Sequence, residues 1–452
     1  MFRRRLLCAV LAAWLAVPAL TRAAGPQFIG MGDSIGEAVQ SADASAATQV
    51  FSYLNLIGAR LGGPFPQAYI RTNLFGFVGG TMNRSRIHPA VEGLNLAVSG
   101  ADVDSLLRDR ADGVTDSETD LILSPRLGSQ MEIAESLQPV FVACWIGNND
   151  ALGAVTAFDQ LNGSQLTPLS SFTADFTEIA DRLQAMGSKA VFGTIPDVST
   201  IAFLLSRDEV TAVLGSAGGM APGDRTSIVA VLLIRIGAAP ISLLSDPDFI
   251  LTAAEAGLIS QRISEFNTVI KDVAAARGMG VADIGQLFEI IASNPPVVFG
   301  IPVTTRFLGG IFSLDAVHPS NIGQAMVANV FINAFNATYG AGMTPLSLQE
   351  LSFLFLTDPF VDHDRDGKVR GRFGAGLLET IMRSLEISGD PDDFNPGVFS
   401  AETAPGIRPE LGSRVLSEIR RLTGKNLHGA PLAEIAAEFG RLFGLERFQA
   451  DR

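Results

Sequence analysis

The feature that most restricts the fold of this chain is a series of short, largely apolar segments separated by helical patterns. These segments are residues 28–31, 93–98, 139–146, 189–196 and 279–284. The segment 139–146 is continuously apolar, which is typical of strands that are buried on both faces, as in parallel sheets. Because the segments alternate with helical patterns, we predict βαβ units and hence an α/β fold whose parallel sheet is covered on both faces.

The first apolar segment ends at a flexible turn that carries one hydroxyl group. Residues 28–36 read FIGMGDSIG, and the glycines allow tight turning and close backbone approach. A strand ending here presents Ser34 at the carboxyl edge of the sheet, where ligands of open α/β folds bind. A serine beside glycines is also a common turn residue or helix N-cap. The turn by itself therefore makes Ser34 only a candidate nucleophile.

A second turn, almost three hundred residues downstream, carries a histidine and a carboxylate. Residues 315–320 read DAVHPS, and a carboxylate three residues before a histidine can touch it within one turn. A serine that attacks an ester needs a base for its proton and an acceptor that orients the imidazole. His318 and Asp315 suit these roles, whereas a structural histidine and a turn-capping carboxylate are the alternative. The chain has four histidines, and His88 lacks a carboxylate placed as Asp315 is.

The N-terminus has the pattern of a secretory signal. Three arginines precede an apolar run at residues 6–20, and small residues follow at 21–24. A membrane anchor is the alternative, but the run is shorter than the roughly 20 residues that a spanning helix needs. We therefore predict a signal peptide at residues 1–23, cleavage near Ala23, export, and no transmembrane span in the mature chain.

Charge and cysteine content restrict the partners of the mature chain. Loss of residues 1–23 removes four arginines and no acidic residue, which takes the formal net charge from −14 to −18. A polyanion lacks the basic stripe that phosphate contacts need, so we expect no nucleic-acid partner. Cys8 is also lost, which leaves Cys144 as the one cysteine and excludes an intramolecular disulfide. Because Cys144 lies in an apolar segment, we expect it to be a buried core residue.

Four short blocks in this chain resemble those of the GDSL esterases and lipases, the SGNH hydrolase superfamily. They are GDS at residues 32–34, SG at 99–100, GNND at 147–150 and DAVH at 315–318. All four occur in the family's order, each just after a predicted strand or before the final helix. Ile35 stands where the family name has leucine, which is a conservative apolar change.

The resemblance covers roughly residues 26–338 and implies a three-layer, flavodoxin-like fold with a five-stranded parallel sheet. It implies that Ser34 attacks an ester carbonyl, that His318 is general base and then acid, and that Asp315 orients His318. The oxyanion hole would consist of the N–H groups of Ser34 and Gly100 and the side chain of Asn149, a neutral amide donor. The resemblance implies no cofactor for catalysis.

The substrate follows less directly from the sequence. An apolar insertion at about residues 200–260 is either a set of extra core helices or a lid over the site. Together with a hydrophobic content of 47%, it favours an acyl ester or lipid, hence a carboxylesterase or lipase, ahead of a carbohydrate O-deacetylase. An acyltransferase would use the same residues. The alternative from another class is a non-catalytic surface protein that binds with calcium.

A small-residue link at residues 340–344 separates the hydrolase domain, residues 24–340, from a C-terminal region, residues 345–452. Four helical patterns in this region predict a small helical appendage to the α/β body. Nothing in the sequence indicates the oligomeric state.

An acidic hexapeptide, DHDRDG at residues 362–367, is the chemical signal of the C-terminal region. Asp362, Asp364 and Asp366 match the first half of an EF-hand calcium loop, in which alternate oxygens face the ion. The second half departs from the pattern, because Phe373 stands where the loop needs a bidentate acid. We expect a structural calcium at the three aspartates, with an ordinary acidic turn as the alternative.

Overall fold

The computed structural model describes residues 26–63, 65–78, 81–114, 117–156, 165–372, 377–394 and 406–443. The predicted signal peptide, residues 1–23, and Phe373 lie outside these ranges. Within the described ranges, every helix is too short or too polar to cross a membrane.

A parallel sheet of four strands forms the centre of the molecule. Its order is β1 (Phe28–Gly32), β4 (Phe141–Trp145), β5 (Lys189–Gly193) and β9 (Gly280–Ala282). All three pairings are parallel, and every residue of β1 and β4 is buried. Four of the five segments therefore form strands of a parallel sheet, as predicted.

The predicted fifth strand, residues 93–98, runs parallel to β1 but is not a full strand. Backbone hydrogen bonds of 2.8–3.1 Å join it to β1, yet only Gly30 and Asn95 form a β-bridge. The Asn95 side chain accepts a hydrogen bond from the Ala97 N–H at 3.1 Å and donates one to the Gly36 carbonyl at 2.8 Å. The sheet thus has four strands instead of five, and the 93–98 segment completes a flavodoxin-like order.

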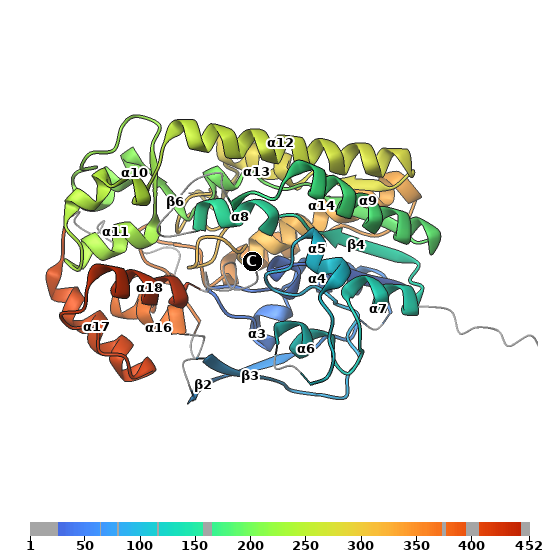
Figure 1. Ribbon diagram of the computed structural model, residues 1–452, viewed down its shortest axis with the longest axis horizontal. Helices are drawn as coiled ribbons and strands as arrows, with labels where there is room; N and C mark the ends of the chain where they lie inside the picture. The colour runs from blue at the N-terminus through green and yellow to red at the C-terminus, as the bar shows by residue number, and fades with distance from the viewer. Residues whose placement is uncertain are drawn as a thin grey trace, which may run out of the picture.

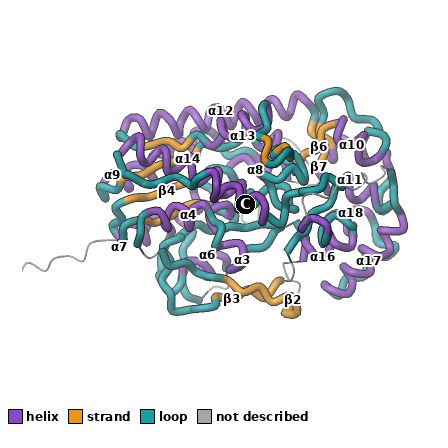
Figure 2. The backbone as a smooth tube through the Cα atoms, turned by 180° about the vertical axis from the view of Figure 1, so that it is seen from behind, coloured by secondary structure: helices purple, strands orange, loops and turns teal. Residues whose placement is uncertain are grey.

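Helices cover both faces of the sheet and give three layers (Figures 1 and 2). Phe192 of β5 packs against Phe176, with ring centroids 4.9 Å apart. Trp145 of β4 lies 6.5 Å from Phe331 on the other side. The two faces are distinct because Phe192 pairs with Cys144, whose side chain points opposite to that of Trp145. Cys144 is buried and forms no disulfide, as expected.

Each face has its own set of helices. Those that pack together on the Phe176 side are α5 (Val103–Arg108), α7 (Gln130–Leu137), α9 (Leu169–Ala185) and α12 (Ala253–Ala276). Those that pack together on the Phe331 side are α4 (Tyr53–Arg60), α13 (Ile284–Ser293), α14 (Asn321–Tyr339) and α15 (Leu348–Thr357).

Short elements complete the α/β body. They are α2 (Ser34–Glu37), α3 (Ala46–Gln49), α6 (Glu118–Leu123), α8 (Asn149–Thr156), η2 (Val198–Thr200), β10 (Val297–Val298) and β11 (Ile301–Pro302). Apolar residues at helical spacing predict one helix at residues 48–61, but the structure splits it into α3 and α4. The split falls at Ser52, whose side chain caps α4 by accepting a hydrogen bond from the Leu54 N–H.

Residues 62–89, whose sequence predicts a loop, contain an antiparallel hairpin. It consists of β2 (Ile70–Val78) and β3 (Thr81–Arg86), and its register shifts between Asn73 and Val78. The Gly, Pro, Asn and Arg content of this stretch indicates a loop, and it obscures the β-branched and aromatic residues of the strands.

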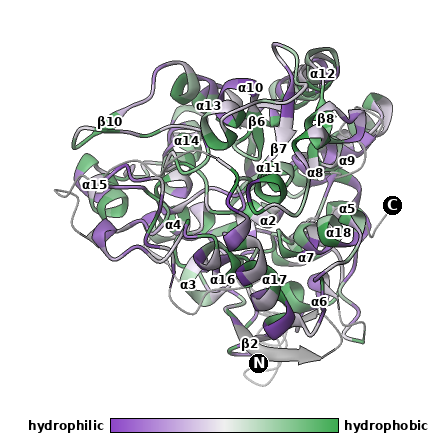
Figure 3. Cartoon of the chain, turned by 90° about the vertical axis from the view of Figure 1, so that its left-hand side faces the viewer, coloured by the Kyte–Doolittle hydropathy of each residue, from purple (hydrophilic) through white to green (hydrophobic). Residues whose placement is uncertain are grey.

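The insertion at residues 200–260 contains a small antiparallel sheet and two helices. They are β6 (Leu204–Ser206), β7 (Arg225–Ser227), β8 (Ile250–Leu251), α10 (Arg207–Leu214) and α11 (Ile228–Arg235), with short turns η3 (Ile241–Ser245) and η4 (Pro247–Phe249). All residues of α11 before its last are buried, and Figure 3 shows α11 as a hydrophobic helix. Many of the apolar residues of the insertion therefore belong to a helix that is buried in the core.

The C-terminal helices pack beside the insertion (Figure 1). They are α16 (Leu377–Ser384), η5 (Asp392–Phe394), α17 (Pro409–Thr423) and α18 (Leu432–Leu442). Helix α18 contacts α11, and the rings of Phe203 and Phe443 lie 6.3 Å apart. The buried residues of these helices belong to the same hydrophobic core as those of the sheet.

Candidate active site

Ser34 lies at the carboxyl end of β1, where it begins helix α2. Gly32 permits this geometry: its φ is +152°, and an added Cβ would come within 2.4 Å of the Trp145 carbonyl oxygen on β4. Gln130 holds the Gly32 backbone by donating to its carbonyl (2.8 Å) and accepting from its N–H (2.9 Å). Close packing against β4 and the two hydrogen bonds with Gln130 therefore fix the end of β1 that carries Ser34.

Asp33 braces the turn at Ser34. It caps α2 by accepting a hydrogen bond from the Ile35 N–H at 2.9 Å, and it accepts a second one from Asn148 Nδ2 at 2.8 Å. Burial raises the pKa of Asp33 to about 6, although the hydrogen bonds from Asn148 and Ile35 act to lower it. The side-chain amide of Asn148 is thus hydrogen-bonded to Asp33.

The structure brings Ser34, His318 and Asp315 into one hydrogen-bonded chain. His318 Nε2 lies 2.8 Å from Ser34 Oγ, and His318 Nδ1 lies 2.8 Å from Asp315 Oδ2. The exposed fraction is 5% for Ser34, 5% for His318 and 1% for Asp315. A base can therefore reach the hydroxyl proton, and a carboxylate can hold the imidazole tautomer, in a site largely shielded from water.

Asp315 is held as a carboxylate by its surroundings. Besides His318, it accepts hydrogen bonds from the Ala42 N–H (2.8 Å), the Val317 N–H (3.0 Å) and the hydroxyl of Ser313 (3.1 Å). Burial acts to raise the pKa of Asp315, but the charge of His318 and the hydrogen bonds outweigh it and hold the pKa below its usual value. An ionised Asp315 can stabilise a positive His318.

Residues beside this cluster adopt positive φ although they are not glycines. They include Ser41 (φ 53°), Ala42 (φ 58°) and Ala316 (φ 60°). Hydrogen bonds hold these turns, such as that from the Ser41 N–H to Ser313 Oγ at 2.9 Å. Because such conformations cost of order 1–3 kcal/mol and gather at active sites, their position beside Asp315 supports a functional role for this pair of turns.

The predicted oxyanion-hole donors are the N–H groups of Ser34 and Gly100 and the side chain of Asn149. Within the described residues, the N–H groups of Ser34 and Gly100 have no protein acceptor. Asn149 is the first residue of helix α8, which follows β4. Its side-chain amide donates a hydrogen bond to the Ala101 carbonyl at 2.7 Å.

Glu37 was missed by the sequence analysis. Its Oε2 accepts hydrogen bonds from the N–H (2.8 Å) and hydroxyl (2.6 Å) of Ser99, the residue before Gly100. Arg84 pairs with the same carboxylate at 2.8 Å, and both side chains are buried. Glu37 therefore ties helix α2 to the turn of Gly100. Its only sequence signal is its place three residues after Ser34.

A small apolar cavity of about 40 Å³ adjoins Ser34 and His318. Its apolar wall consists of Trp145, Leu152, Pro196, Val198, Ile201, Phe288, Phe312, Val317 and others. A larger cleft of about 520 Å³ shares Pro196, Ile201, Phe288 and Phe312 with it. Residues next to β5, from the insertion and from α13 thus form the walls between the two spaces.

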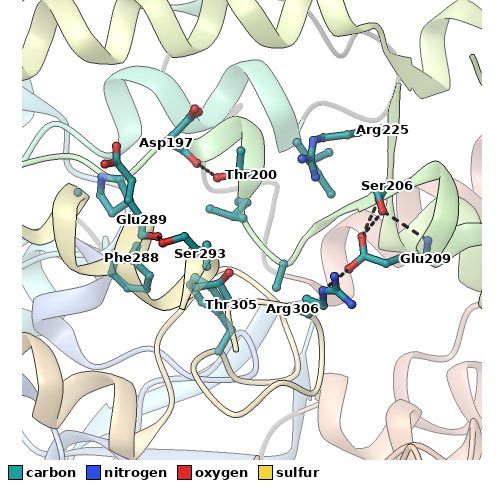
Figure 4. A pocket seen from close by; sticks show the side chains of 17 residues that line it. Asp197, Thr200, Ser206, Glu209, Arg225, Phe288, Glu289, Ser293, Thr305 and Arg306 are labelled. Atoms are coloured by element: carbon teal, nitrogen blue, oxygen red, sulfur yellow. Dashed lines mark hydrogen bonds and ion pairs between the residues drawn. The ribbon is translucent and has the colours of Figure 1, made fainter. Parts of the chain in front are cut away.

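The larger cleft is lined by charged and hydroxylic side chains (Figure 4). They include Asp197, Glu209, Arg225, Glu289 and Arg306. Glu209 accepts a hydrogen bond from the Ser206 hydroxyl at 2.7 Å and lies 3.7 Å from Arg306. The site therefore combines an apolar chamber at the serine with a polar space beside it.

The other histidines lie away from this site. His88 is exposed and does not line the cavity at Ser34. The Nε2 of His363 lies 3.0 Å from the Phe355 carbonyl, and His428 lies 3.2 Å from Ser417 at the surface. Burial raises the pKa of the Cys144 thiol, so this cysteine is a poor nucleophile.

The acidic hexapeptide forms a different cluster from the one expected. Oxygens of Asp362 and Asp364 lie within 4.8 Å of one another and of an oxygen from Asp393, outside the hexapeptide. Asp366 instead forms an ion pair with Lys368 at 3.1 Å. The sequence offered no signal for Asp393, because only folding brings it to the loop.

The chain is similar to a known protein family. A family model described as GDSL-like Lipase/Acylhydrolase matches residues 29–331, more than half of the chain. A search of curated proteins found no match.

Several solved structures match this chain over most of their own length, at low sequence identity. TesA is 12% identical, with 69% of this chain and 98% of that chain covered and a TM-score of 0.31. An α/β hydrolase from the metagenome of Lake Arreo, Spain, is 14% identical, with 70% and 97% covered and a TM-score of 0.34. A mutant acetylxylan esterase from Geobacillus stearothermophilus is 12% identical, with 72% and 97% covered and a TM-score of 0.36.

Proposed function

Because the chain belongs to the GDSL-like lipase/acylhydrolase family, whose members cleave esters, we propose that it is a serine carboxylesterase for short acyl groups. The observation that carries this proposal is the 2.8 Å contact between Ser34 Oγ and His318 Nε2 at the wall of a 40 Å³ apolar cavity. The contact supports nucleophilic catalysis, and the cavity supports a small acyl group.

In the first half of the reaction, Ser34 Oγ attacks the ester carbonyl carbon while His318 Nε2 takes the hydroxyl proton. Asp315 stabilises the imidazolium and keeps its Nδ1–H in place. The carbonyl oxygen becomes an oxyanion that the N–H groups of Ser34 and Gly100 and the amide of Asn149 can bind. Each such donor typically contributes about 2.7–4 kcal/mol to transition-state stabilisation. His318 then protonates the leaving alcohol, and the acyl-enzyme remains.

In the second half, water takes the place of the alcohol. His318 removes a proton from the water as it attacks the acyl carbon, and the same three donors bind the second oxyanion. Collapse of this intermediate returns the proton to Ser34 Oγ and releases the carboxylic acid. The chain's own residues supply every proton transfer in this cycle.

The volume of the cavity limits the acyl group. A single water needs roughly 10–15 Å³ of such space, so a 40 Å³ cavity accommodates only a few heavy atoms. Rings of Trp145 and Phe288 and the Leu152 side chain close its walls. The composition of the chain favours acyl esters, and the size of this cavity favours short ones within that class.

The polar cleft supports a second, finer proposal about the alcohol. Its five charged residues and its 520 Å³ volume suit a hydroxyl-rich leaving group better than an aliphatic one. O-deacetylation of a carbohydrate is therefore our second candidate, with the acetyl group in the small cavity and the sugar in the cleft.

Hydrolysis of p-nitrophenyl esters from acetate to palmitate tests the proposal. We expect the highest kcat/KM on acetate or propionate. Leu152→Ala removes part of the cavity wall and should raise the butyrate-to-acetate ratio of kcat/KM roughly 10-fold. Leu258→Ala, at a residue that is 60% exposed on α12, is the matched control and should leave the ratio unchanged. An optimum at octanoate or longer in the wild-type enzyme would refute the short-acyl assignment.

A further inference from the structure

Outside the active site, one group of side chains in the described ranges has the geometry of a metal site. One oxygen from each of Asp362, Asp364 and Asp393 lies within 4.8 Å of the others. Asp362 and Asp364 come from the turn after α15, whereas Asp393 comes from η5. Three carboxylates from two separate segments therefore converge on one small volume.

An independent observation is that two of these carboxylates are buried with an unpartnered oxygen. Asp364 is 1% exposed and Asp393 is 3% exposed. The Oδ2 atom of each is buried and has no hydrogen-bond partner within the described residues. Burial of an unpaired carboxylate oxygen costs several kcal/mol, and buried polar groups in native proteins almost always have a partner. A cation between them would supply it.

Other oxygens of the cluster accept hydrogen bonds from backbone N–H groups. Asp393 Oδ1 accepts a hydrogen bond from the His363 N–H at 3.0 Å, and Asp364 Oδ1 accepts one from the Asp366 N–H at 3.2 Å. Asp362 accepts from the N–H groups of Arg365 (2.7 Å) and Gly367 (3.0 Å). These bonds fix the carboxylates without neutralising them.

Basic groups near the cluster are directed elsewhere. Lys368 pairs with Asp366 at 3.1 Å and with Asp390 at 3.6 Å. The guanidinium of Arg365 donates to the Gly300 carbonyl. Within the described residues, no ion pair reaches Asp362, Asp364 or Asp393. Lys368 and Arg365 therefore supply no counter-charge to the three carboxyl groups.

We propose that Asp362, Asp364 and Asp393 bind a divalent cation, with Ca²⁺ preferred. The donor set consists of hard carboxylate oxygens, which Ca²⁺ and Mg²⁺ take and softer metals do not favour. Ca²⁺ is preferred because it accepts irregular sets of six to eight oxygens, whereas Mg²⁺ demands a near-ideal octahedron. Gly367, with a φ of +84°, provides the sharp turn that such a loop requires.

The cation would join η5 to a segment that supports the active site. On one side of the acidic loop, Asp358 accepts a hydrogen bond from the Ile322 N–H of α14 at 2.8 Å. On the other side, Arg372 donates to Gln40 and to Asn321 (3.0 Å). Helix α14 follows directly after the turn of His318. Bound Ca²⁺ should thus stabilise the tail against the base of α14.

Calorimetric titration of the full mature chain with CaCl₂ and, separately, MgCl₂ tests the proposal. We expect one Ca²⁺ per chain, at least 10-fold weaker Mg²⁺ binding, and a higher thermal midpoint with Ca²⁺ than with EDTA. These measurements do not depend on catalysis, so a negative result would leave the esterase proposal unaffected.

Variants identify the ligands. Asp393→Asn should weaken Ca²⁺ binding at least 10-fold, as should Asp364→Asn. Asp392→Asn, at the exposed neighbour of Asp393 in η5, should leave it unchanged. Circular dichroism with EDTA checks that each variant is folded, and two ligand variants keep the test valid if one is not. Absence of binding in the wild-type protein, a preference for Mg²⁺, or wild-type affinity in a folded Asp393→Asn protein would overturn the proposal.

Discussion

The hydrogen-bonded chain from Ser34 to Asp315 is built from two turns that lie far apart in the sequence. Ser34 and His318 are separated by 284 positions, and each turn is fixed by its own local contacts. Gly32 and Gln130 set the first, and the hydrogen bonds to Asp315 set the second. Preorganisation of this kind lets the proton transfer proceed without rearrangement of the side chains.

Replacement of Asp315 by Asn should lower kcat without unfolding the protein. An amide can still accept from some backbone N–H groups. In one orientation, however, its nitrogen would face both His318 Nδ1 and the Ala42 N–H, and in the other it would face the N–H groups of Val317 and His318; all of these need an acceptor. In the first orientation the imidazole would lose the tautomer that accepts the Ser34 proton. We expect a loss of roughly 10²–10⁴-fold in kcat, smaller than the loss in His318→Ala, measured on p-nitrophenyl acetate.

The control for the Asp315→Asn and His318→Ala variants is His88→Ala, at an exposed histidine away from the cavity. It should retain wild-type kcat. Activity lost in His88→Ala but kept in His318→Ala would contradict the assignment of the base.

At the residue scale, the sequence predicted those side chains whose spacing is local. The aspartate three residues before His318 and the glycine two residues before Ser34 are of this kind. Glu37, Gln130 and Asp393 could not be predicted, because each acts on a turn that only the tertiary fold brings near. A buried glutamate in a polar stretch has no distinctive pattern.

Helix α14 is the element that joins the active site to the C-terminal region. It begins just after the turn of His318, where Ser320 caps it by accepting a hydrogen bond from the Gly323 N–H. A second cap comes from Asp358, which accepts from the Ile322 N–H (2.8 Å) and the Phe360 N–H (3.0 Å). The region after residue 345 therefore contributes directly to the start of this helix.

Replacement of Asp358 by Ala should destabilise the protein. It leaves two buried N–H groups without acceptors, so we expect the free energy of unfolding to fall by about 1–3 kcal/mol. Urea denaturation followed by circular dichroism measures this difference. Asp248→Ala, at an exposed side chain in η4, is the control and should change the free energy by less than about 0.5 kcal/mol. Equal unfolding midpoints for the two variants would contradict this role of Asp358.

At the element scale, the long periodic helices and continuously apolar strands were predictable, since burial on one or both faces imposes their pattern. The segment 93–98 bonds to β1 but forms only one β-bridge with it, so its apolar residues predicted its place beside β1 and not its extent. The β2–β3 hairpin was missed because turn-forming residues surround its strands.

At the scale of the whole molecule, one hydrophobic core connects the sheet, the insertion and the C-terminal helices. The order of the apolar segments was enough to predict the three layers. It could not predict that α18 would contact α11, because amphipathic helices carry no information about which apolar face they meet. The insertion also supplies walls to both spaces beside Ser34, including Ile201, so some of its residues both pack in the core and line these spaces.

The central claim is that Ser34 forms an acyl-enzyme, and acid-quenched mass spectrometry tests it most directly. The mature protein is mixed with p-nitrophenyl acetate, quenched within the first turnover and digested. We predict an acetyl group on the peptide that contains Ser34, and none on that peptide in Ser34→Ala, which should remain folded and release no p-nitrophenolate above background. An acetyl group on a different residue, or wild-type turnover in Ser34→Ala, would contradict the account.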